Sequence, residues 1–142
     1  MKTKKKMMSL LLAVCMVLTL MPTIALAEES TVDTWDGSAD TSWYTGHESD
    51  AEYHITTAEQ LAGLAQLVND KTTSTSFAGK KIYLDNDLDL SGHQWSPIGT
   101  GSNHANFFAG VLEGQNHKIM NLYHHTAEND FRNGLFGIVS DG

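Results

Sequence analysis

The feature that most constrains the fold is a short motif that recurs at near-equal spacing in the second half of the chain. Leu90-Ser91-Gly92 is followed by Leu112-Glu113-Gly114, and then by Leu135-Phe136-Gly137 with Gly134 before it. A repeat of about 20–50 residues is typical of stacked architectures in which each unit packs on the next. The spacing of the three closing glycines therefore predicts stacked coils with a period of roughly 22–23 residues.

The same region alternates between apolar and polar residues, as a strand with one buried face does. One side of the alternation holds four aliphatic residues and the other holds an aromatic and three acids: Ile82, Leu84, Leu88 and Leu90 against Tyr83, Asp85, Asp87 and Asp89. Further short strands are expected over 108–112, 118–123 and 134–139, with corners at 116–117 and 133–134, because Asn and Gly tolerate positive φ. We predict a mainly β fold, a parallel β-helix of about three short coils over 77–142. An antiparallel β-sandwich is the alternative.

One helix is expected, from Thr57 to Asn69, within a capping segment that covers 56–70. Thr56 with Glu59, or Thr57 with Gln60, forms a capping box. Apolar residues then follow at i, i+3, i+4 and i+7, namely Leu61, Leu64, Ala65 and Val68. A stack of coils exposes apolar core at its end, so this helix is predicted to cap the stack just before the first coil.

Residues 28–55 read as a polar lead-in with little regular structure beyond one short strand near Trp43. Three aromatic residues stand in it, Trp35, Trp43 and Tyr44. We expect them to dock on the domain, and stacking on a glycan is the alternative.

Residues 1–27 have the three parts of a secretory signal peptide. Four lysines precede an apolar run from Met7 to Met21, and Ala25-Leu26-Ala27 supplies the small-x-small cleavage pattern. A membrane span needs about 20 apolar residues, so this run is too short for one. We expect cleavage between Ala27 and Glu28 and a secreted or cell-surface protein.

Cleavage would leave five Lys and Arg against 17 Asp and Glu, a net charge of −12, and would remove the only cysteine, Cys15. Such an acidic chain is not expected to bind nucleic acid or anionic lipid, which require basic surfaces. Without a thiol it cannot form a disulfide, so its stability must come from a packed core or a bound ion.

Several segments in order resemble a known family: 57–65 (TAEQLAGLA), 77–80 (FAGK), 88–92 with 95–99, 108–119 (FAGVLEGQNHKI) and 134–137 (GLFG). Together they are similar to the start of the GLUG-motif, pectate-lyase-like β-helix regions of large surface proteins, mostly from Gram-positive bacteria. The resemblance implies a right-handed β-helix and a modular parent that continues beyond Gly142. It supplies no catalytic residues.

Candidate chemistry is sparse in the sequence. Counted from Asp85, the acidic run lacks the Gly and Glu that a calcium loop needs at positions six and twelve, so we interpret its carboxylates as a solvated strand face. The seven histidines show neither a zinc motif nor ligand spacing. No catalytic residue, metal site or cofactor is therefore expected.

The leading functional hypothesis is a non-catalytic adhesive or spacer module of a larger envelope protein. One alternative is the start of a carbohydrate-active enzyme whose catalytic coils lie beyond residue 142. The other is a carbohydrate-binding module that uses Trp35, Trp43 and Tyr44. Expected partners are a glycan or a host or cell-wall component, and self-association through an open C-terminal coil.

Overall fold

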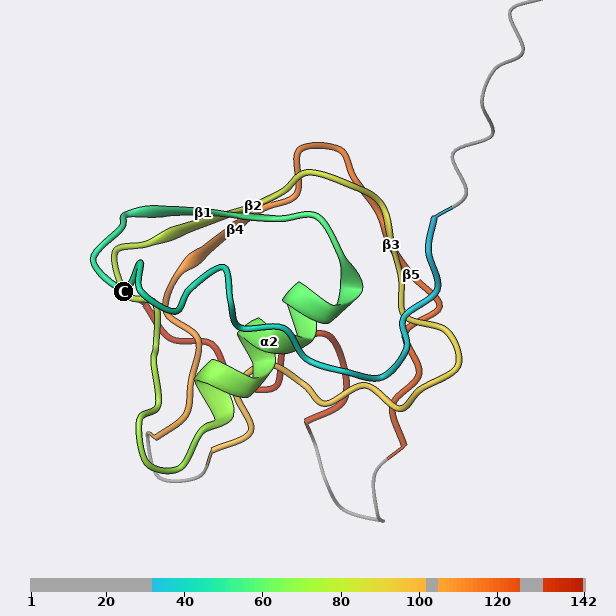
Figure 1. Ribbon diagram of the computed structural model, residues 1–142. Helices are drawn as coiled ribbons and strands as arrows, with labels where there is room; N and C mark the ends of the chain where they lie inside the picture. The colour runs from blue at the N-terminus through green and yellow to red at the C-terminus, as the bar shows by residue number, and fades with distance from the viewer. Residues whose placement is uncertain (1–31, 102–104, 126–131, 142) are drawn as a thin grey trace, which may run out of the picture. The chain divides into compact units, whose positions relative to one another are not determined.

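The computed structural model describes residues 32–101, 105–125 and 132–141 (Figure 1). The chain forms β1 (Glu52–Ile55), α2 (Ala58–Asn69), β2 (Lys81–Leu84), β3 (Leu88–Asp89), β4 (Val111–Glu113) and β5 (Ile119–Met120), in that order. The strands are short and loops connect them. The signal peptide predicted over residues 1–27 lies outside the described residues.

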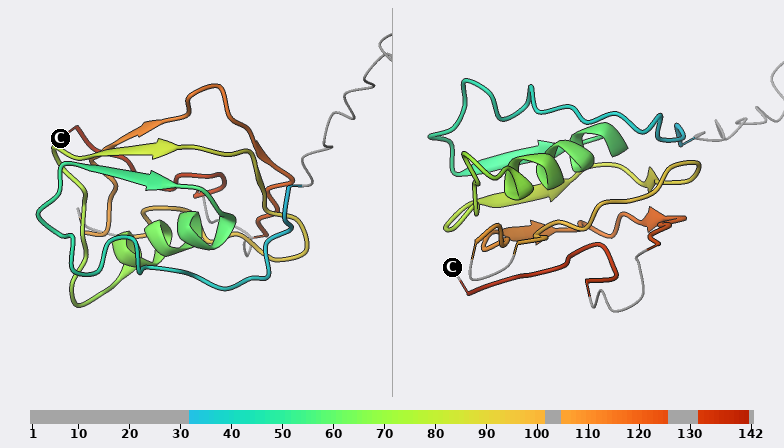
Figure 2. Two further views of the ribbon diagram at one scale, coloured as in Figure 1. Left: turned by 45° about the horizontal axis from the view of Figure 1, so that its top comes forward. Right: turned by 90° about the horizontal axis from the view of Figure 1, so that it is seen from below.

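Every strand pairing among the described residues is parallel. One sheet has the order β1-β2-β4 and the second pairs β3 with β5. Single parallel bridges join Thr34 to Asp89, Ile98 to Phe136 and Phe108 to Val139. These pairings place successive passes of the chain in stacked layers (Figure 2). A mainly β fold is therefore confirmed, and the antiparallel sandwich is wrong for this part of the chain.

The core lies inside the stack of layers, and the aliphatic side of the predicted alternation contributes to it. Ile82, Leu84, Leu88 and Leu90 are all buried, whereas the acidic side is partly exposed. Ile55 on β1 stacks above Leu84 in register, so neighbouring layers place apolar residues one over the other. The predicted strand alternation is confirmed.

Aromatic rings form a second column through the stack. Phe77, Phe108 and Phe136 follow one another with ring centroids 6.4 Å and 5.3 Å apart. Phe77 adopts φ = 60°, a conformation unusual for a bulky residue, and it is 1% exposed. Packing of its ring against Tyr44, Tyr53 and Phe108 stabilises that conformation.

The helix matches its prediction closely, because the signals that define it are local. It begins after Thr57, whose hydroxyl accepts a hydrogen bond from the Gln60 amide at 3.3 Å. The Gln60 side chain in turn accepts a hydrogen bond from the Thr56 amide at 2.8 Å. Thr57 is thus the N-cap, and the predicted apolar stripe is buried.

The position of the helix differs from the prediction. β1 precedes α2, and β1 pairs with β2, so the helix lies inside the first layer rather than before it. Its last residue, Asn69, binds the layer below by donating to the Pro97 carbonyl at 2.8 Å and accepting from the amides of Gly99 and Thr100 at 3.0 Å and 2.9 Å. The helix therefore takes the place of a strand on that side.

The lead-in also differs in part. Residues 52–55, which were assigned to it, form β1, and residues 42–46 form turns where a strand was expected. The docking of its aromatic residues is confirmed: Trp35 belongs to the core, and Trp43 and Tyr44 pack against it. The lead-in crosses α2, where the Asp40 amide donates to the Glu59 carbonyl at 2.8 Å.

The coil period predicted from the spacing of the triplets is wrong, because the true offset between layers is longer. Glu52 pairs with Lys81, Lys81 pairs with Val111, and Leu88 pairs with Ile119. The triplets do not stack on one another, since Leu112 pairs with Ile82 and Ile98 bridges Phe136. Their glycines also serve different purposes.

Gly92 has φ = 87°, a turn conformation that favours glycine, whereas an added Cβ on Gly114 would meet open space. Gly137 packs against the Gly99 backbone, and Gly134, just before the third triplet, has φ = 153°. The motif thus meets a positive φ at Gly92 and a close backbone contact at Gly137, but no such requirement at Gly114.

Gly63, in the middle of α2, tests the contact between the helix and the lead-in. An added Cβ would collide with the Asp40 carbonyl, which is backbone and cannot move independently. We predict that Gly63→Ala lowers the free energy of unfolding by about 1–3 kcal/mol through overpacking, although alanine favours an isolated helix by about 1 kcal/mol. Chemical denaturation measures this, with Gly114→Ala as the matched control. Equal stability of the two variants would contradict the packing.

Candidate functional site

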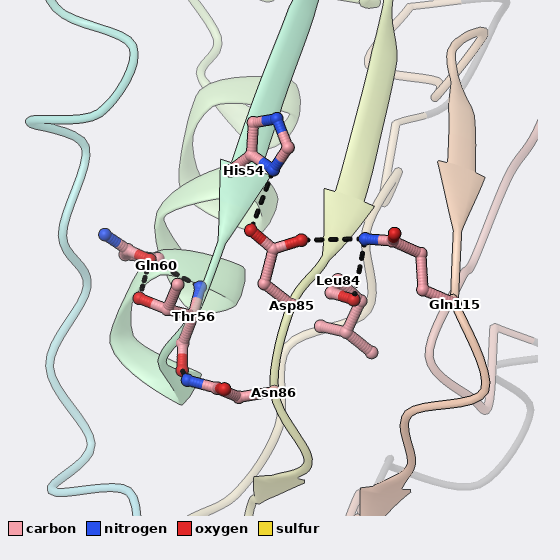
Figure 3. A network of polar contacts seen from close by, with 7 residues as sticks. All are labelled: His54, Thr56, Gln60, Leu84, Asp85, Asn86 and Gln115. Carbon is pink, nitrogen blue, oxygen red and sulfur yellow. Dashed lines mark hydrogen bonds and ion pairs between the residues drawn. The ribbon is translucent and has the colours of Figure 1, made fainter.

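Polar side chains link successive layers along the edge where β1, β2 and β4 end. We call this set the corner ladder: Asp85, Asp87 and Asp89 with their partners His54, Gln115, His117 and Asn121. At its centre, Asp85 Oδ2 lies 2.7 Å from His54 Nδ1, and Asp85 Oδ1 accepts from Gln115 Nε2 at 2.7 Å (Figure 3). One carboxylate thus bonds to the layer above and the layer below.

The ladder continues along the chain beyond Asp85. Asp87 Oδ1 accepts from the Lys118 amide at 2.9 Å and lies 3.2 Å from His117 Nδ1. Asp89 Oδ1 accepts from Asn121 Nδ2 and from the Ser91 amide, both at 2.9 Å. The acidic run does face outward, as interpreted from the sequence, and each of its carboxylates is also a hydrogen-bond acceptor for the neighbouring layer.

These hydrogen bonds favour the charged form of two ladder carboxylates. The Lys118 amide, followed by His117, holds the pKa of Asp87 below its ordinary value of 3.8. Asn121 and then Ser91 lower the pKa of Asp89 in the same way. Hydrogen bonds that an ionised carboxylate accepts stabilise that form relative to the protonated one. Asp87 and Asp89 are therefore charged near neutral pH.

The ladder does not assemble a metal centre. In the described ranges, no three His, Cys, Asp or Glu side chains come together as a ligand set. His47 pairs with Asp50, and His124 Nδ1 lies 2.6 Å from the Trp95 carbonyl, so each of these histidines already contacts another group of the protein. His104 lies outside the described residues. The hydrogen bonds of the ladder instead join neighbouring layers.

A groove of about 420 Å³ lies beside α2, between the lead-in and the segment 94–96. We call it the Trp35–Trp95 groove. Buried apolar residues and exposed polar residues line it, and we call the exposed polar residues its rim. The buried apolar residues are Trp35, Ala62, Ala65 and Trp95, the rim is Gln66, Asp70, Gln94 and Ser96, and Gly37, Ala39 and Asn69 complete the lining. The two indoles meet edge to face with centroids 5.7 Å apart.

Two of the three aromatic residues proposed as glycan contacts lie away from this groove. Trp35 lines it, but Trp43 and Tyr44 belong to a separate cluster with Tyr53 and Phe77. The predicted trio thus does not form one surface. Sequence reasoning missed Trp95, which is far from Trp35 along the chain. Its prediction that Ala65 is a core residue is confirmed, and Ala65 also lines the groove. Nothing local in the sequence signals that these residues share a groove.

Comparisons with protein-family models, with curated proteins and with solved structures find no match to this chain. The resemblance noted in the sequence therefore stays a prediction. No helix in the part of the chain that the structure describes has the length and apolar character needed to cross a bilayer.

The lowered pKa of Asp87 predicts how acid affects the fold. Because the carboxyl is more acidic in the folded state, the unfolded state binds more protons as the pH falls toward 3.8, and stability decreases through and below that value. Asp87→Asn removes this titrating group. The melting temperature of this variant should therefore fall less than that of the wild type when the pH is lowered from neutral to below 3.8. Thermal unfolding at several pH values measures this. Asp33→Asn, at an exposed position outside the ladder, is the control, and equal acid dependence in both variants would contradict the prediction.

Proposed function

We propose that this chain is a non-catalytic module of an exported cell-envelope protein, a right-handed parallel β-helix that acts as an adhesive or spacer element. The observation that carries the proposal is the all-parallel pairing of successive layers, from β1 through β2 to β4 and from β3 to β5. Stacked parallel layers make a rigid body that extends along one axis, and each layer contacts only its neighbours. Such a body suits a spacer that holds binding surfaces away from the cell.

The N-terminal sequence supports export. A basic segment, the apolar run from Met7 to Met21 and Ala25-Leu26-Ala27 occur in the order that a signal peptidase recognises. Loss of residues 1–27 would give a chain of net charge −12 without cysteine. A thiol-free acidic chain is compatible with an oxidising exterior and repels other acidic molecules.

The lowered pKa values and the hydrogen bonds of the corner ladder support a structural role over a catalytic one. General acid–base chemistry needs carboxyl groups that are within reach of a substrate and have pKa values near the working pH. Asp87 and Asp89 instead have lowered pKa values and accept hydrogen bonds from the next layer. Their environment favours a permanent charge that joins layers.

The Trp35–Trp95 groove favours carbohydrate binding as a second candidate function. Ligand sites are concave and mostly apolar, with a few polar groups that orient the ligand, and this groove has that composition. An adhesive module needs a surface of this kind. The two candidates are compatible, because one concerns the body of the module and the other concerns a site on it.

Export is tested with the chain in a Gram-positive host. We expect an antibody to detect it in the medium or wall fraction, with an N-terminus at Glu28 by mass spectrometry. Ala27→Asp replaces the small residue at the cleavage position, so the precursor should accumulate at the membrane. Ala51→Asp, an exposed position in the mature region, is the matched control. Recovery of the intact chain from the cytoplasm would contradict the proposal.

A further inference from the structure

We propose that the Trp35–Trp95 groove binds a neutral saccharide of one or two rings. This inference deepens the second candidate function and rests on it, but it does not depend on the role as an exported spacer, because it uses only the shape and chemistry of the groove. The groove's volume of about 420 Å³ lies within the range of about 300–1,000 Å³ that is usual for small-ligand sites.

The apolar part of the groove comes from small side chains and from the borders of two rings. Trp35 is 6% exposed and Trp95 1% exposed, so neither indole offers an open face as a flat stacking platform. A ligand must instead enter the groove and cover the apolar wall that Ala62 and Ala65 complete. The apolar faces of a sugar ring fit such a wall, while its hydroxyl groups point to the rim.

The rim supplies hydrogen-bonding groups without positive charge. Gln66 and Ser96 offer an amide and a hydroxyl. Asp70 offers Oδ2 of its carboxylate, because its Oδ1 already accepts from the Thr72 and Thr73 amides at 2.6 Å and 2.7 Å. Gln94 donates its Nε2 to the His125 carbonyl at 2.7 Å, which leaves its carbonyl oxygen for a ligand hydroxyl. Among the described residues, no Lys or Arg lines the groove. An anionic ligand would therefore meet a carboxylate and no cation, so the chemistry favours a neutral, hydroxyl-rich molecule.

The walls argue against an extended peptide as the occupant. Peptides that add to a sheet need unpaired backbone groups along a strand edge. Here one wall is α2, whose backbone pairs within the helix. At the other two walls, the Trp35 amide donates to the Asp89 carbonyl and the Trp95 amide donates to the Tyr123 carbonyl. Recognition must therefore come from side chains, which suits hydroxyl groups distributed around a ring.

The groove is held in shape before any ligand arrives. Trp35 Nε1 donates to the Ser38 carbonyl at 2.7 Å, and Trp95 Nε1 donates to the Leu135 carbonyl at 3.2 Å. Asn69 fixes the end of α2 to residues 97–100. Since the ring orientations and the helix end are fixed, binding costs little ordering of the protein.

The test is a nuclear magnetic resonance titration of the full chain with chitotriose, lactose and maltotriose, and with trigalacturonate as the acidic comparison. We expect saturable shifts of the Trp35 and Trp95 indole N–H signals with at least one neutral sugar, at a Kd of about 1 mM or tighter. The Trp43 signal, from the other aromatic cluster, should stay in place. Trigalacturonate should bind at least tenfold more weakly.

Two variants locate the site. Ala39→Phe places a large side chain at an exposed position on the groove wall and should abolish binding, whereas Ala51→Phe, exposed outside the groove, should bind like the wild type. Gln66→Ala removes one rim hydrogen bond and should weaken binding roughly threefold to tenfold. The proposal is overturned by no saturation with any neutral sugar up to ~10 mM, by binding that Ala39→Phe leaves intact, or by preference for trigalacturonate. None of these results bears on export.

Discussion

The stacking of parallel strands is the constraint on which the rest of this structure depends. Neighbouring strands lie about 4.8 Å apart, so each layer must place its side chains directly over those of the next. Inside, this forces apolar residues into columns such as Phe77, Phe108 and Phe136. Outside, it brings polar residues from different layers within hydrogen-bonding distance, and the corner ladder results. One geometric requirement thus explains both the core and the polar edge.

Elements with local signals could be predicted from the sequence. The helix follows from a capping box and an apolar stripe within one short segment, and its N-cap was identified to within one position. The alternation of apolar and polar residues from Ile82 to Leu90 is likewise a local signal, because it requires only that every second residue be apolar. β1 was missed because its sequence, Glu-Tyr-His-Ile, follows a polar stretch and is too short to establish an alternation. Its burial comes from pairing with β2, which is a tertiary effect.

The layer offset was not predictable from the motif that drew attention to it. Leucine with a nearby glycine fits turns, close contacts and open loops alike, so its spacing does not measure the distance between stacked residues. A better signal was present: Phe-Ala-Gly occurs at 77–79 and again at 108–110, close to the offset at which the strands pair. Both phenylalanines lie in the aromatic column, and both precede a strand of the same sheet. A repeat is informative when its residues must occupy the same place in every layer.

The groove could not be predicted, because it arises from the difference in thickness between a helix and a strand. A helix with side chains is about 10 Å wide, whereas a strand takes up less than half of that in the stacking direction. When α2 replaces a strand in the first layer, the lead-in must cross over it. At Gly63 the missing side chain lets the Asp40 backbone touch the helix. Nearby, Ala62 and Ala65 leave a space beside Trp35 that the lead-in does not fill. The residues that admit the helix into the stack therefore also leave the concave surface of the Trp35–Trp95 groove.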